Sequence, residues 1–336
     1  MPETVSQGAS PGVQLTALCA QGSTEVILCA PFIKVGALER VLGSVPAGVT
    51  LKCVTRWRPD EIAWGVSDLE VWPLLRERGE SSLWLCSSLH AKYYRVDTSC
   101  LIGSANITAT ALGWAVQSNL ELLASMPLDH PSVAGFESRL FASSTEVDNS
   151  IYDQMCGVVE IISAQFQQSY CQFETMEQTV ASEHPDIASY RDPCWLPTLR
   201  NPEELFLAYS GHIARLSSAS QEAACSDLAT LAVPSGLPKE AFEAYVAALL
   251  LQQPVIRVVD ALAAAPQRFG AVRDAIAAAM PKDRVGFDAD RAWQTLMRWL
   301  RHFLPNRYGL SVPNHSEVFY RTAPDGGDQT RLQNGS

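Results

Sequence analysis

The chain has 336 residues, of which 47% are hydrophobic and 18% are charged, and its formal net charge is −11. This length favours two domains, and the composition excludes wholesale disorder. The negative charge excludes a protein that coats nucleic acid through its overall charge. The acidity is local, because residues 144–199 carry one basic and nine acidic side chains, whereas residues 200–336 carry 14 of each.

The first half of the chain alternates short apolar runs with amphipathic stretches after a loose lead-in of about twenty residues. This alternation predicts an α/β layer structure. Ser67 is a candidate N-cap with Glu70 at the capping-box spacing, and Gly79 is the expected end of that helix. We expect strands at 25–30, 51–55, 83–86, 90–96, 100–102 and 119–124, and helices at 36–42 and 67–78 and from 105 to 112.

The composition changes near Ser143 and again at a proline-rich stretch that ends with Pro197. Apolar residues at helical spacing mark the segment between these points, and helices are expected beyond it at 203–216, 221–231, 239–251, 269–279 and 288–303. We therefore predict a catalytic domain at 1–143, an acidic and partly helical connector at 144–200, and a mainly helical C-terminal domain at 201–336.

The sequence also predicts the cellular compartment of the protein. The first residues show no basic stretch followed by an apolar run, and no segment approaches the roughly 18 apolar residues of a membrane span. Nine cysteines occur without a Cys-x-x-Cys pair. These features predict a cytoplasmic protein with reduced thiols and no membrane partner.

One stretch carries chemistry: His90-x-Lys92, followed by Asp97 and then by Gly103-Ser104-x-Asn106. A strand at 90–96 would place His90, Lys92 and Tyr94 on one face, where the first two would be costly in a core unless they lined a site. Histidine can act as a nucleophile or a proton shuttle near neutral pH, and lysine supplies a positive charge for an anion. Ser104 and Asn106 add neutral donors after a glycine that permits close backbone approach.

Asn119-Leu120-Glu121 places two further polar groups downstream. A carboxylate at Glu121 could orient His90 by accepting its second N–H. The alternative is that Glu121 is a surface carboxylate on an edge strand.

Together these residues resemble the HKD motif of the phospholipase D superfamily over about residues 25–125. The family has six residues between the aspartate and the glycine, whereas this chain has five between Asp97 and Gly103. Asn119-x-Glu121 is similar to the acidic position that follows the motif in single-motif nucleases. The resemblance implies a phospholipase D-like mixed sheet flanked by helices.

The resemblance also implies phosphodiester chemistry without a metal or other cofactor. His90 would attack phosphorus and form a phosphohistidine, while Lys92, Ser104 and Asn106 hold the phosphate oxygens. Asp97 and Gly103 would be structural. The chain has no second His-x-Lys, so a complete site requires two copies, most simply in a symmetric homodimer.

The resemblance favours a DNA endonuclease of a bacterial restriction or phage-defence system, with other subunits of such a system as possible partners. At its most specific, the resemblance points to the phospholipase D-like component of gene clusters that insert 7-deazaguanine derivatives in DNA. Two alternatives stay open: a phospholipid hydrolase or transferase, and a non-catalytic DNA-binding subunit of a defence complex.

Three other groups of residues permit two interpretations each. Arg56 and Arg58 could grip a nucleic-acid backbone, or form ion pairs with Asp60, Glu61 or Asp68. The arginines of 288–303 could belong to a recognition helix in a winged-helix-like module, or to an ordinary amphipathic helix. The sparse set Cys156, Cys171, His184 and Cys194 lacks the close pairing of structural zinc ligands, so no metal is predicted.

Overall fold

A computed structural model describes residues 9–173, 194–281, 286–312 and 317–322, with side chains described up to residue 165 in the first range. The chain divides into two compact units. One comprises residues up to 193 together with 252–254, and the other comprises 194–251 together with the residues from 255 onward.

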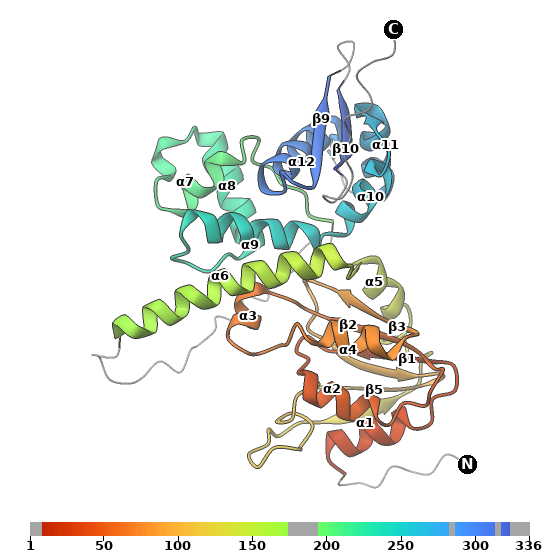
Figure 1. The fold of residues 1–336 in the computed structure, drawn as a ribbon. Helices are drawn as coiled ribbons and strands as arrows, with labels where there is room; N and C mark the ends of the chain where they lie inside the picture. The colour runs from red at the N-terminus through yellow and green to blue at the C-terminus, as the bar shows by residue number, and fades with distance from the viewer. Residues whose placement is uncertain (1–8, 174–193, 282–285, 313–316, 323–336) are drawn as a thin grey trace. The chain divides into compact units, whose positions relative to one another are not determined.

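The first unit is built on a seven-stranded mixed sheet in the order β6-β5-β4-β1-β2-β3-β7 (Figure 1). The pairs β1–β2 and β2–β3 are parallel, and the remaining pairs are antiparallel. The strands are β1 (Glu25–Cys29), β2 (Thr50–Thr55), β3 (Ser81–Leu85), β4 (Lys92–Val96), β5 (Ser99–Gly103), β6 (Leu123–Met126) and β7 (Thr145–Glu146).

Helices flank this sheet, as expected for a phospholipase D-like mixed α/β fold. They are α1 (Pro11–Cys19), α2 (Val35–Leu42), α3 (Pro59–Ala63), α4 (Val71–Arg78), α5 (Phe136–Ala142) and α6 (Asn149–Phe173). Alternate residues of β1 point to opposite sides of the sheet. Ile27 and Cys29 share one core cluster with Leu140 of α5. The predicted α/β class is therefore confirmed.

The periodicity of the predicted connector appears in α6. Ile151, Met155, Val158 and Ile162 are all buried, at the spacing of one helical face. This long helix belongs to the first compact unit.

Several local expectations were wrong. The lead-in contains α1, whose N-terminus is capped by Ser10. Residues 105–112 form turns instead of a helix. Ser67 does not cap α4, because its hydroxyl group bonds the backbone of Ile33 instead, and the N-cap of α4 is Glu70. Gly79 ends that helix with a positive φ of 67°, as expected from a glycine.

Two strands begin later than expected, which moves two candidate site residues off regular structure. β4 starts at Lys92 and β6 starts at Leu123. His90 and Glu121 therefore lie in the segments that lead into these strands. The expectation that His90, Lys92 and Tyr94 share one strand face holds only for the last two, because His90 precedes the first residue of β4. Tyr94 is buried, whereas His90 is exposed.

The second unit is mainly helical, as expected, and also contains a three-stranded antiparallel sheet in the order β8-β10-β9. Its strands are β8 (Gln267–Arg268), β9 (Tyr308–Ser311) and β10 (Val318–Arg321). Its helices are α7 (Glu203–Tyr209), the short η1 (Ile213–Arg215), α8 (Ser218–Leu231), α9 (Lys239–Leu251), α10 (Pro254–Ala263), α11 (Phe269–Ala279) and α12 (Ala289–Phe303).

A buried carboxylate holds the start of the second unit in place. Asp227 of α8 is fully buried and accepts hydrogen bonds from Thr198 N at 3.0 Å and Leu199 N at 2.8 Å. Trp299 of α12 donates to Leu199 O at 2.8 Å. The segment before α7 is thereby fixed to two helices of the unit.

Candidate active site

The two halves of the motif meet across the hairpin of β4 and β5. Lys92 lies opposite Gly103 in the antiparallel register, and Val96 lies opposite Ser99. The hairpin therefore turns through only Asp97 and Thr98, and Asp97 adopts a positive φ of 49°. This tight turn accommodates the short spacing between Asp97 and Gly103.

Asp97 lies at the far end of β4 from Lys92. Its carboxylate accepts backbone hydrogen bonds from Ser23 at 2.8 Å, Thr24 at 2.9 Å and Glu25 at 2.9 Å. These donors lower the pKa of Asp97 to about 2. The geometry gives Asp97 the role of fixing the start of β1 to the hairpin.

Gly103 is required by the close approach of β6. A Cβ at this position would lie 1.9 Å from Leu122 O, a distance that no side chain tolerates. Ser104 N donates to that same carbonyl at 3.0 Å. The glycine thus lets the chain after β5 run directly against residues 121–123.

Glu121 is brought to Ser104 by this approach. Ser104 Oγ donates to Glu121 Oε2, and Asn119 Nδ2 donates to Glu121 Oε1 at 3.2 Å. Ser104 Oγ also accepts a hydrogen bond from Leu122 N at 3.1 Å. The carboxylate at the acidic position is therefore hydrogen-bonded to the serine of the motif.

Asn106 is held beside the loop that follows β1. Its Oδ1 accepts a hydrogen bond from Phe32 N at 3.4 Å, and Ile107 forms a bridge with Ile33 next to it. The hydroxyl group of the buried Tyr94 donates a hydrogen bond to Ala105 O at 2.6 Å. Sequence reasoning placed Tyr94 on the face of Lys92 but missed this anchoring contact.

His90 and Lys92 complete the cluster at the start of β4. His90 is exposed, and Lys92 is half-buried with its Nζ 3.0 Å from His90 O. Burial lowers the pKa of Lys92, and the nearby Arg56 lowers it further while Glu121 acts in the opposite direction. Lys92 therefore lies within the electrostatic reach of Arg56 and Glu121.

The two arginines after β2 differ in position. Arg56 pairs with Glu61 and also donates to Leu89 O at 3.4 Å, next to His90. Arg58 pairs with Asp60 at 3.3 Å, and both side chains are largely buried. The structure thus has the ion pairs of the structural interpretation, yet Arg56 still borders the motif.

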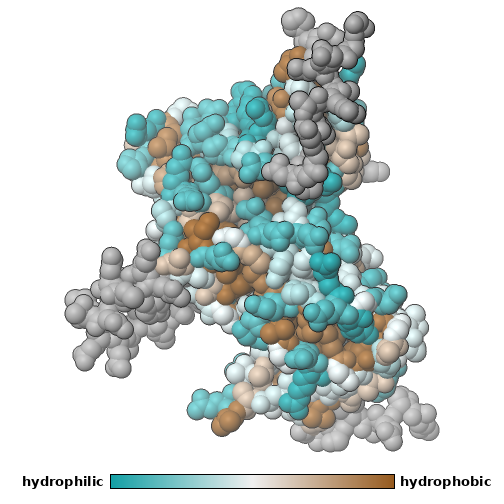
Figure 2. Space-filling model, viewed as in Figure 1, coloured by the Kyte–Doolittle hydropathy of each residue, from teal (hydrophilic) through white to brown (hydrophobic). Residues whose placement is uncertain are grey.

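An apolar rim adjoins this cluster. We use this term for Val116, Leu120 and Leu122, which lie on the loop between β5 and β6 and are strongly exposed. The loop projects from the sheet in Figure 1, and hydrophobic surface appears at its end in Figure 2. The leucines flank Glu121 directly. The strand expected at 119–124 gave no indication of their exposure.

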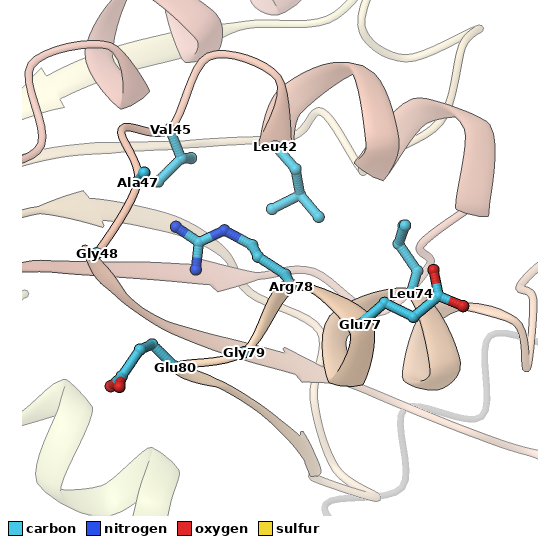
Figure 3. Close-up of a pocket in the computed structure, with 9 residues that line it drawn as sticks. All are labelled: Leu42, Val45, Ala47, Gly48, Leu74, Glu77, Arg78, Gly79 and Glu80. Atoms are coloured by element: carbon cyan, nitrogen blue, oxygen red, sulfur yellow. The ribbon is translucent and has the colours of Figure 1, made fainter.

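A pocket of about 460 Å³ lies elsewhere, between α2, α4 and the start of β3. Figure 3 shows Leu42, Arg78 and Glu80 in its lining. The pocket lies beside the amino ends of the parallel strands β2 and β3, whereas the motif residues gather near the carboxyl ends of the parallel strands. None of the predicted site residues lines the pocket.

Among the residues whose side chains are described, no three His, Cys, Asp or Glu side chains gather as a metal site. Cys156 and Cys194 are reduced cysteines, while the side chain of Cys171 and all of His184 lie outside the described residues. No single helix among the described residues is long and apolar enough to span a membrane, although the bent pair α9–α10 passes the length and composition test.

Comparison with known proteins gives no family model that matches this chain. It also gives no matching curated protein. The solved structures that are similar include NucT from Helicobacter pylori, with 14% identity over 40% of this chain and 89% of that one and a TM-score of 0.33.

Two further structures are similar. Nuc from Salmonella typhimurium, described as a phospholipase D family member, has 17% identity over 41% of this chain and 90% of its own, with a TM-score of 0.32. Phosphatidylserine synthase from Haemophilus influenzae has 12% identity over 54% of this chain and 47% of its own, with a TM-score of 0.37. The chain is thus similar, over part of its length, to solved structures that include a phospholipase D family member.

Proposed function

We propose that this protein is a phospholipase D-like phosphodiesterase that cleaves DNA without a metal ion. One observation supports the proposal above the others: Lys92, Ser104, Asn106 and Glu121 come from three separate segments and gather near the carboxyl ends of the parallel strands. His90 lies in the segment that enters β4 there. Cationic and neutral donors around an exposed imidazole suit a phosphodiester anion.

The proposed reaction begins with an attack of the His90 imidazole nitrogen on phosphorus. A P–N bond forms, and the bond from phosphorus to the leaving oxygen breaks. Lys92 and Asn106 stabilise the charge that builds up on the non-bridging oxygens. The leaving oxygen takes a proton from a second histidine, which is the partner subunit's His90 in our proposal.

Water then resolves the phosphohistidine. The partner subunit's His90 accepts a proton from the water as its oxygen attacks phosphorus, and the P–N bond breaks to release His90. Each histidine thus returns to its starting protonation state. Glu121, held by Ser104 and Asn119, acts in this proposal as the carboxylate that orients the imidazole.

The apolar rim supports the homodimer that this reaction requires. Leu120 and Leu122 would remain in water in a single chain, and exposed apolar side chains beside a polar site are typical of a contact surface. A two-fold contact through the rim would bring two copies of His90 toward each other and complete the site.

Incubation of the purified chain with labelled DNA in excess EDTA tests the proposal. Cleavage that persists in EDTA, together with a phosphorylated protein intermediate that is stable to base and labile to acid, would support it. Cleavage that is lost in EDTA and restored by Mg²⁺ would contradict the mechanism. Binding without turnover would favour the non-catalytic subunit instead.

A phospholipid hydrolase or transferase is the second candidate, and the apolar rim is the observation that favours it. Exposed leucines beside a phosphodiester site could enter the interface of a bilayer. Turnover of phospholipid vesicles, and a loss of vesicle binding in Leu120→Ser with Leu122→Ser, would support this candidate. Preserved vesicle binding in that variant would contradict it.

We propose a biological role in restriction or phage defence, on the basis of the motif resemblance. The finer proposal concerns DNA that carries 7-deazaguanine derivatives. Cleavage of unmodified DNA, with modified DNA spared, in the presence of the other subunits encoded nearby would support it, and equal cleavage of both would contradict it.

A further inference from the structure

The second unit ends in a small module of three helices and three strands. In chain order the elements are α10, β8, α11, α12, β9 and β10, and the antiparallel sheet places β10 between the other two strands. Figure 1 shows α12 beside β9 and β10. This is the element order of a winged helix, in which the third helix and the last hairpin are adjacent.

The two faces of α12 are strongly different. Trp293, Leu296, Trp299, Leu300 and Phe303 are buried within the unit. The opposite face carries an arginine stripe, which we define as Arg291, Gln294, Arg298 and Arg301, within about 80° of the helix circumference at 100° per residue. Arg291 and Arg301 are exposed, and Arg298 is half-buried.

Two other arginines of the module form ion pairs with carboxylates. Arg273 pairs with Asp274 and Asp290, and Arg307 pairs with Asp260. Within the described ranges, by contrast, no carboxylate forms an ion pair with the guanidinium groups of the arginine stripe. Three positive charges therefore project from one helix face.

The charge of the whole module agrees with this local picture. Residues 255–322 contain ten arginines and lysines against six aspartates and glutamates, which is a net charge of +4, whereas the chain as a whole carries −11. This separation of charge favours a polyanion as a partner of the module.

We propose that the arginine stripe binds duplex DNA, with α12 in the major groove and the β9–β10 hairpin beside it. The helix has 15 residues and so spans about 22 Å, and the major groove is wide enough to admit an α-helix. Arginine pairs well with guanine edges and phosphates, and glutamine pairs with adenine. An acidic protein partner would match the positive charge of the stripe, but it has no base edges with which the arginine and glutamine side chains could pair.

This site is separate from the chemistry proposed at His90. A chain that binds DNA through α12 and cuts none would still satisfy the inference. Conversely, a chain that cleaves DNA but does not bind the duplex through the arginine stripe would satisfy the proposed function and contradict this inference.

Fluorescence anisotropy of the full-length chain with a labelled 30-base-pair duplex tests the inference, in a His90→Ala background so that the probe stays intact. The test variant carries Arg291→Gln, Arg298→Gln and Arg301→Gln. We expect its affinity to fall at least about tenfold, and the slope of log K against log salt to decrease by about three if each arginine contacts a phosphate.

The matched control carries Arg139→Gln, Arg200→Gln and Arg215→Gln, three exposed arginines outside the module. It makes the same change in net charge, so it separates the position of the charges from their number. A lysine version of the stripe keeps the charge and should keep most of the salt-dependent affinity. It also tests the inference if the glutamine variant fails to fold.

Several results would overturn the inference. They are no duplex binding by the parent chain at low salt, unchanged binding in the glutamine variant, an equal loss in the matched control, and displacement of the duplex by polyglutamate as effectively as by unlabelled duplex. Preferential binding of single-stranded DNA by the stripe would also contradict the duplex as its partner. Absence of EDTA-resistant cleavage by the chain with His90 intact, together with duplex binding that depends on the stripe, would count against the proposed function alone.

Discussion

Ser104 donates its hydroxyl hydrogen to Glu121, seventeen positions later in the chain. A serine hydroxyl has one hydrogen to donate, so Ser104 cannot donate to this carboxylate and to a phosphate oxygen at the same time. The contact therefore couples the acidic position to the motif, and it makes Ser104 a support for Glu121 as well as a candidate phosphate donor.

Replacing Glu121 by Gln should reduce turnover by about 10²–10⁴-fold, the range of an orienting carboxylate or general base. The amide keeps the shape of the side chain and removes its charge. DNA binding should change little because Lys92 and Asn106 remain. Single-turnover rates and binding constants would measure both effects.

The matched control for this variant is Glu77→Gln. Glu77 is an exposed carboxylate on α4 that lines the pocket of Figure 3, beside the amino ends of the parallel strands. It should leave the rate unchanged. A rate for Glu121→Gln within about twofold of the parent would place Glu121 outside the catalytic machinery.

Ser104→Ala should be non-additive with Glu121→Gln. If the hydroxyl group acts mainly by holding the carboxylate, the double variant should lose less than the two single variants predict together. The coupling free energy should lie in the range of about 0.5–3 kcal/mol that residues in direct contact show. A double-mutant cycle on the single-turnover rate measures it, and strict additivity would mean that Ser104 serves the phosphate independently of Glu121.

The part of this site that could be predicted from sequence is the part set by local spacing. Lys92 and Gly103 flank a hairpin, and a short loop between two strands fixes their register. The mixed α/β class followed in the same way from alternating apolar runs. These features depend on residues that are close in the chain.

Features that depend on distant packing could not be predicted. The exposure of Leu120 and Leu122 depends on where β6 begins, and β6 begins at Leu123 because this residue pairs with Gly103, the last residue of β5. Arg56 could have faced solvent or Glu61 with equal local plausibility. The sheet of the second unit joins β8 to β10 across two helices, and its strands are too short for a periodicity signal.

Gly103→Ala should destabilise the first unit by about 1–3 kcal/mol, because a methyl group at this position forces β6 away from β5. Urea unfolding of the full-length chain, followed by tryptophan fluorescence, would measure the loss. The activity should fall together with the stability, since the same contact places Glu121.

Gly36→Ala is the matched control for that substitution. Gly36 lies inside α2, and a Cβ there would meet nothing within 4 Å. Alanine should therefore stabilise the helix by up to about 1 kcal/mol. Equal effects at both glycines would show that the close approach of Leu122 O is not what position 103 requires.

The stability of the second unit should depend on the protonation of Asp227. Burial raises the pKa of this carboxyl group from 3.8 to about 6, although the hydrogen bonds from Thr198 and Leu199 act in the opposite direction. Between these two values the folded state binds more protons than the unfolded state. The contribution of Asp227 to the free energy of unfolding should therefore be present below about pH 4 and decrease as the pH rises to about 6.

Asp227→Asn isolates this effect because the amide does not titrate. The difference in unfolding free energy between the parent and the variant should shrink as the pH rises through this window, when both are unfolded in urea under the same conditions. A difference that stays constant from pH 4 to 7 would contradict the raised pKa.

A composite site predicts how mixtures of active and inactive subunits behave. If each dimer has one site that needs both copies of His90, a dimer with one His90→Ala subunit is inactive. An equal mixture with full subunit exchange should then retain about a quarter of the parent activity, because a quarter of the dimers carry two intact subunits. Independent sites would retain about half.

Coexpression of the two forms with different affinity tags gives the mixed dimers directly. Sequential purification on both tags isolates dimers with one intact subunit, and light scattering checks that they remain dimers. His90 is exposed and precedes the first residue of β4, so its removal should change neither the unfolding midpoint nor the dimer mass. The purified mixed dimer should be inactive in EDTA on DNA that the parent cleaves, and half activity in that sample would show that one histidine suffices for each site.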